Sequence, residues 1–163
     1  MVRRLRRDEA GKSPGCSRIG TNGSCQAHIR PFSEFARDLA ASTVARYNFI
    51  VPDLCDDMHD SCGGSAIAHG DGWLKRNAPL ILGSSAYRSG GVLLITWDEA
   101  AKGDGPIPMI VLSPFAKGNH YSNGTYYTHG STLRTLQEVF GVYPLLQNAG
   151  SATDLRSMFS VFP

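Results

Sequence analysis

Two acidic residues follow directly on a predicted buried strand in the middle of the chain. Residues 90–99 have the sequence GGVLLITWDE, in which a mainly apolar run ends at Trp97 and is followed by Asp98 and Glu99. Such a run predicts a buried strand, and open α/β sheets bind ligands at the carboxyl ends of their strands. Two neighbouring carboxylates repel each other unless a cation or a shared proton intervenes. The pattern therefore leaves two alternatives, a metal site at Asp98 and Glu99 or a solvated strand end.

A second acidic cluster follows another predicted strand, residues 47–51. Residues 53–62, which we call the acidic loop, contain four aspartates and one histidine within eight positions: Asp53, Asp56, Asp57, His59 and Asp60. Carboxylates at this density suit a hard cation such as calcium or magnesium, for which Asp56 and Asp57 are candidate ligands. The imidazole of His59 is a candidate phosphate contact or general acid. The alternative is a solvated turn in which the aspartates cap backbone groups.

A third candidate is His129, which precedes a predicted helix over residues 132–140. Ser131 is a suitable N-cap for this helix, and Gly141 is a suitable residue just beyond its end. The amino terminus of a helix attracts anions through its free N–H groups and its dipole, so His129 could lie near a phosphate. The alternative is a loop histidine bonded to the backbone. Three further histidines lack such a context and are interpreted as surface or structural residues: His28, His69 and His120.

The elements that must position these residues alternate between strands and helices, which predicts an α/β fold with a layered sheet and helices on its faces. Apolar residues at helical spacing predict a helix over residues 31–43. Asp71 is a candidate N-cap for a second helix, which Pro79 should kink or restart. Strands are predicted at residues 91–97 and 108–112. The ten residues between them are few for a parallel crossover, so one of the two can be antiparallel. Short helical turns are expected from Pro144 onward.

The length of 163 residues predicts one α/β domain, residues 31–163, preceded by an irregular or disordered basic arm, residues 1–30. The net charge of +2 comes from that arm, because residues 1–12 carry five basic and two acidic side chains and the remainder is therefore −1. Nothing in the sequence resembles a nucleic-acid-binding module. No stretch approaches the roughly 20 apolar residues of a membrane span, and the start lacks the apolar region of a signal peptide.

The four cysteines form two closely spaced pairs, Cys16 with Cys25 and Cys55 with Cys62. Cys55 and Cys62 bracket the acidic loop, and a disulfide between them would brace the segment that carries His59. A short disulfide-closed loop of this kind is worth about 2.5 kcal/mol in the chain-entropy model. Metal ligation is a rival interpretation that lacks the usual Cys-x-x-Cys spacing. Free thiols are the third possibility, which applies if the chain is cytosolic.

Five segments, in this order, resemble the C-terminal part of a bacterial phosphoesterase family that includes acid phosphatases and phospholipase C-type enzymes and is related to the alkaline phosphatase superfamily. The segments are FIVPDLCDDMHD (49–60), GDGWL (70–74), LITWDE (94–99), IVLSP (110–114) and YTHGSTLRT (127–135). The resemblance covers residues from about 25 to 163. It implies the C-terminal part of an alkaline phosphatase-like fold.

The resemblance also implies roles for particular residues. Asp98 and Glu99 match the family's metal ligands, and His59 matches an active-site histidine beside the substrate phosphate. His129 falls in the family's His-x-Ser-x-Leu-Arg segment. The residues and the resemblance together predict metal-dependent hydrolysis of phosphate monoesters. The oxygen ligands favour calcium or magnesium, and zinc is a further possibility. Related enzymes are often exported, which favours disulfides over free thiols.

The sequence departs from the family in one respect. Family members are usually much longer, and their N-terminal half carries a Glu-Asn metal-binding motif and a serine or threonine nucleophile that we do not find here. The alternative to an enzyme is therefore a non-catalytic remnant that binds metal or phosphate, or a partial subunit that needs a partner to complete its site. Sheet edges exposed by such a truncation would favour a homo-oligomer.

Overall fold

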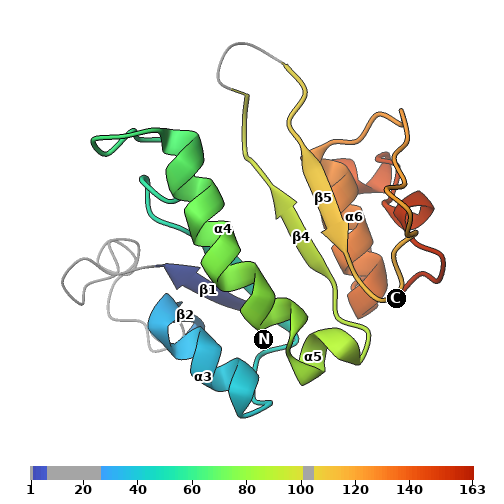
Figure 1. The fold of residues 1–163 in the computed structure, drawn as a ribbon. Coiled ribbons are helices and arrows are strands. Elements are labelled where there is room, and N and C mark those ends of the chain that lie inside the picture. Colours follow the sequence, from blue (N-terminus) through green and yellow to red (C-terminus); the bar gives the residue numbers. More distant parts are fainter. Residues whose placement is uncertain (1, 7–26, 101–104) are drawn as a thin grey trace. The chain divides into compact units, whose positions relative to one another are not determined.

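The computed structural model describes residues 2–6, 27–100 and 105–163, with the backbone alone for residues 2–6 (Figure 1). The described chain forms two compact units, residues 1–89 and residues 90–163. Helices and strands occur in both units, which confirms the mixed α/β class. The likeness to an alkaline phosphatase-like fold stays a prediction, and so does the division into an arm and one domain.

Unit 1 contains a three-stranded parallel sheet in the order β2-β1-β3. Strand β1 (Val2–Arg6) lies in the centre and pairs with β2 (Ile29–Pro31) on one side and β3 (Tyr47–Val51) on the other. Strands β1 and β2 lie within residues 1–30, the range predicted to be an arm. The pairing uses backbone N–H and C=O groups, which a count of basic side chains does not reveal. Residues 7–26, including Cys16 and Cys25, lie outside the described residues.

Four helical segments follow in unit 1: η1 (Phe32–Glu34), α3 (Phe35–Ala40), α4 (Ala66–Leu82) and α5 (Ser85–Arg88). Buried Phe35 and Leu39 of α3 form the core of the unit together with partly buried residues from β3 and α4. The predicted start of α4 at Asp71 is wrong, because Ser65 is the N-cap and its hydroxyl accepts from the N–H of Ala68 at 3.3 Å. The helix also continues through Pro79 without restarting.

Unit 2 begins with two strands, β4 (Leu93–Thr96) and β5 (Met109–Leu112), which pair antiparallel. The short connection between them had suggested this arrangement, which is therefore confirmed. At the end of β4, the Thr96 hydroxyl donates to the carbonyl of Pro108 at 2.9 Å and closes the last pair of the ladder. Asp98 and Glu99 follow Thr96 after one intervening residue, Trp97.

Helix α6 (His129–Phe140) follows, and its end matches the prediction, because Gly141 adopts the left-handed conformation with φ of 64°. Its predicted start is wrong, because Thr128 is the N-cap and His129 is the first helical residue. Two short turns complete the chain, η2 (Gln147–Gly150) and η3 (Arg156–Met158), as expected. The Thr135 hydroxyl is buried and accepts from the N–H of Leu155 at 2.8 Å, which ties α6 to the C-terminal segment.

No helix in the described part of the chain is both long enough and apolar enough to cross a membrane.

Candidate active site

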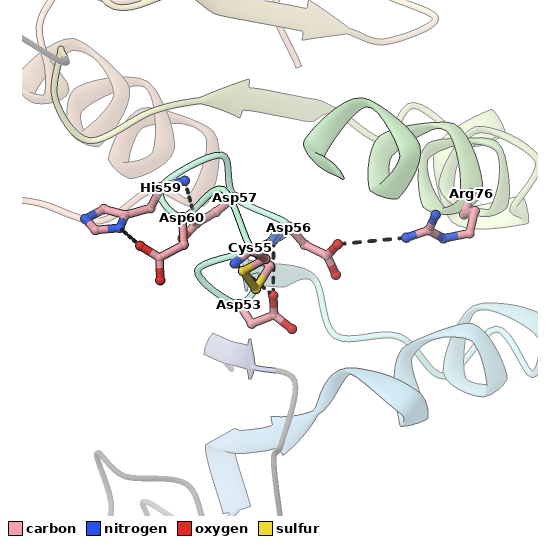
Figure 2. Close-up of a disulfide and its surroundings, with 8 residues drawn as sticks. Asp53, Cys55, Asp56, Asp57, His59, Asp60 and Arg76 are labelled. Atoms are coloured by element: carbon pink, nitrogen blue, oxygen red, sulfur yellow. Dashed lines mark hydrogen bonds and ion pairs between the residues drawn. A yellow bond between two sulfur atoms is a disulfide. The ribbon is translucent and has the colours of Figure 1, made fainter. Parts of the chain in front are cut away.

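The acidic loop folds into a turn that its own aspartates cap. Asp53 Oδ1 accepts from the backbone N–H groups of Cys55 and Asp56 at 3.2 and 3.1 Å. Asp57 Oδ1 accepts from the N–H of His59 at 2.9 Å. A short carboxylate side chain commonly closes a turn in this way. The structure therefore contains the capped turn that was predicted from the sequence as the alternative to a metal site. In this turn His59 lies at the exposed outer end of the loop (Figure 2).

His59 is held by its neighbour in the sequence. The ring Nδ1 lies 2.8 Å from Asp60 Oδ1, and 71% of the imidazole is exposed to solvent. An ionised carboxylate only accepts hydrogen bonds, so Nδ1–H is the donor and Nε2 is the basic nitrogen of the neutral ring. A carboxylate that orients an imidazole in this manner is a recurring part of acid–base sites. From the sequence alone, Asp60 is placed in the acidic loop without a role in orienting His59. The signal for that role is the position of Asp60 next to His59 in the sequence.

The acidic loop is attached to α4. Asp56, whose side chain is only 10% exposed, pairs with Arg76 at 3.9 Å (Figure 2). Met58 packs so closely on Gly70 that a Cβ at that glycine would lie 2.4 Å from the Met58 Cγ. Because Gly70 has no side chain, the loop can approach the helix at this point. The contacts that these groups make are with protein, and metal ligation by Asp56 and Asp57 stays a prediction.

The disulfide between Cys55 and Cys62 is present, which confirms the prediction for this pair. The two Cα atoms lie 5.7 Å apart, within the ordinary range for a disulfide. The disulfide closes the acidic loop around His59. Together with the contacts of Asp56 and Met58 with α4, it restricts the position of the loop that carries the imidazole.

Removal of this disulfide is expected to lower the free energy of unfolding by about 2.5 kcal/mol, the chain-entropy value for a loop of this length. The change is the double substitution Cys55→Ser and Cys62→Ser, measured by urea denaturation without reductant. The matched control is the unsubstituted protein with dithiothreitol, which should approach the stability of the double variant. Equal stability of the variant and the oxidised protein would show that the bond does not brace the loop.

In unit 2, Asp98 and Glu99 are both exposed and lie at the end of β4. Asp98 Oδ1 accepts from the backbone N–H of Glu99 at 3.0 Å, so the first carboxylate helps to fix the turn that presents the second. The first residue of α6 approaches the same turn: His129 Nε2 lies 2.8 Å from the backbone oxygen of Asp98. The structure therefore brings together three of the predicted site residues, Asp98, Glu99 and His129.

The donor chemistry of this turn fits a magnesium-type cation. Magnesium is typically bound by one or two carboxylates and keeps water or substrate phosphate in its other positions. Within residues 27–100 and 105–163, no three His, Cys, Asp or Glu side chains form a group that could hold a metal ion by themselves. The acidic loop belongs to unit 1 and the Asp98–Glu99 pair to unit 2, so a cation shared by both stays a prediction.

These arrangements can be compared with known proteins. A model of the phosphoesterase family matches residues 13–143, a range that contains the acidic loop, the Asp98–Glu99 pair and His129. The chain belongs to the phosphoesterase family. The predicted resemblance is thereby confirmed at the level of the family.

One relative of the chain is the phosphatidylinositol-3-phosphatase of Mycobacterium tuberculosis (strain ATCC 25618 / H37Rv). The two sequences are 32% identical over 127 residues, which make up 76% of this chain and 38% of the relative. The chain therefore spans well under half of the length of that relative.

Proposed function

We propose that this chain is a phosphoric ester hydrolase that acts on phosphate monoesters with the help of a divalent cation. Membership of the phosphoesterase family supports the class of reaction. The observation that carries the proposal is the His59–Asp60 hydrogen bond of 2.8 Å on a loop closed by a disulfide. It provides an exposed, oriented imidazole of the kind that general acid–base catalysis requires.

In the proposed reaction, His59 donates a proton to the leaving oxygen as its bond to phosphorus breaks. Water attacks the phosphorus atom, forms the new bond and releases one proton to the solvent, and His59 regains its proton from the solvent afterwards. Asp60 keeps its hydrogen bond to Nδ1–H throughout and stabilises the charged form of the ring before the transfer. Asp98 and Glu99 would hold the cation, which supplies positive charge to the phosphoryl oxygens when it is bound.

Hydrolysis of a simple aryl phosphate tests this proposal. The folded, magnesium- or calcium-loaded chain is expected to release the aryl alcohol from the monoester and much more slowly from the matched diester. Short-chain phosphatidylinositol 3-phosphate is the second substrate, because a relative is named for that phosphatase activity. Faster release from the diester would instead assign the chain to phosphodiester chemistry.

A second candidate function is a phosphate-binding unit without catalysis. Membership of the phosphoesterase family supports contact with phosphate in this case as well. Saturable binding of inorganic phosphate by a folded chain that hydrolyses neither substrate would support this second function over the first.

A further inference from the structure

We propose that His129 acts as a positioning residue that holds the Asp98–Glu99 turn in place through the backbone carbonyl of Asp98. The inference rests on the proposed function, because it takes this turn as the cation-binding part of the site. The His129 ring nitrogen Nε2 lies 2.8 Å from the Asp98 carbonyl oxygen. A carbonyl oxygen only accepts, so Nε2–H is the donor. In the neutral ring Nδ1 then carries no proton, and the ring has no second N–H to offer a substrate.

The amino terminus of α6 is a rigid support for this contact. The Thr128 backbone N–H donates to the hydroxyl of Ser131 at 3.0 Å, one half of a capping box. Ser131 is itself 1% exposed. Gly130 packs against Asn148 of η2, where a Cβ would lie 3.0 Å from the Asn148 amide. The backbone on both sides of His129 is therefore fixed by hydrogen bonding and by close packing.

The turn that His129 contacts has a hydrogen bond on each side of the Asp98 peptide group. The Asp98 carboxylate accepts from the Glu99 N–H at 3.0 Å, and the Asp98 carbonyl accepts from His129. The two bonds together restrict rotation of the peptide that joins the two acidic residues. Loss of the His129 bond frees the carbonyl and lets both carboxylates change direction. Groups that orient metal ligands in this way are typically worth roughly 10- to 100-fold in metal affinity or activity.

A set of three substitutions distinguishes positioning from direct chemistry. The glutamine Nε2 is separated from its Cα by the same number of bonds as the histidine Nε2, whereas the asparagine amide is shorter and reaches only as far as Nδ1. His129→Gln should therefore keep magnesium affinity and kcat within a few-fold of the parent. His129→Asn and His129→Ala should each lose roughly 10- to 100-fold in magnesium affinity, measured by calorimetry. Equal damage in all three variants would overturn the proposal and assign His129 to the substrate, and no damage in any would also overturn it.

Nuclear magnetic resonance of the histidine side chains gives a readout that needs no activity. In mildly alkaline buffer, the ¹⁵N shifts of His129 are expected to show a protonated Nε2 and an unprotonated Nδ1. The opposite tautomer would overturn the proposal whether or not the chain hydrolyses any ester. If the protonated Nε2 is found and His129→Gln retains magnesium binding in a chain that hydrolyses neither test substrate, the positioning role stands and only the proposed function fails.

Discussion

Replacement of His59 by alanine is expected to lower kcat/KM for an aryl phosphate by ~10² or more, the lower end of what general acid–base catalysis contributes. The variant removes the imidazole that is proposed as the general acid. It leaves the capped turn in place, because Asp57 accepts from the backbone N–H of residue 59 and not from its side chain. The measurement is initial-rate kinetics on the cation-loaded protein.

His120→Ala is the matched control for the His59 variant, because His120 is also an exposed histidine and has no assigned role in the site. Its kcat/KM should equal that of the parent. Asp60→Ala should fall between the parent and His59→Ala, since it removes the carboxylate that orients the ring but keeps the ring. Hydrolysis that persists unchanged in His59→Ala would show that this residue is not the general acid.

The second large effect is expected from replacing Asp98 by asparagine. The change removes one of two adjacent carboxylates while conserving size, and the asparagine side-chain oxygen can still accept from the Glu99 N–H. Magnesium affinity and kcat/KM should each fall by about 10² or more, because residues that merely orient a ligand are already worth roughly 10- to 100-fold. Calorimetric titration of chelator-treated protein with magnesium, calcium and zinc measures the affinity.

Asp71→Asn is the control for the charge change, because Asp71 is an exposed aspartate of α4 with no assigned role in the site. It should bind the cation as the parent does. Chelation of the parent should abolish hydrolysis, and added magnesium or calcium should restore it. If millimolar concentrations of all three cations fail to bind the folded parent, the proposed cation dependence is wrong.

The strands that carry the site could be predicted from the sequence because their apolar runs are bounded by polar or turn-forming residues. Strand β3 has the predicted limits, and β4 and β5 lie within the predicted ranges. The end of α6 was also predictable, since a left-handed residue after a helix is usually glycine. The Cys55–Cys62 pairing followed from the two cysteines that flank one polar segment.

Other features depend on partners that a local pattern does not contain. The buried side chains of helix α6 include the polar residues Thr135 and Gln137. Both bond backbone groups of the C-terminal segment: Thr135 accepts from Leu155 and Gln137 accepts from Leu146. Those partners are up to 20 residues away in the sequence. The His129 bond to Asp98 spans 31 residues and was invisible for the same reason.

The central place of β1 in the unit 1 sheet has a consequence for protein engineering. A strand with a parallel neighbour on each side has backbone groups bonded in both directions. Deleting residues 2–6 would therefore split the sheet and leave β2 and β3 with two unpaired facing edges, which invite association between chains. An affinity tag placed before residue 2 would continue directly from the middle strand, whereas a tag after residue 163 follows a segment that belongs to neither sheet.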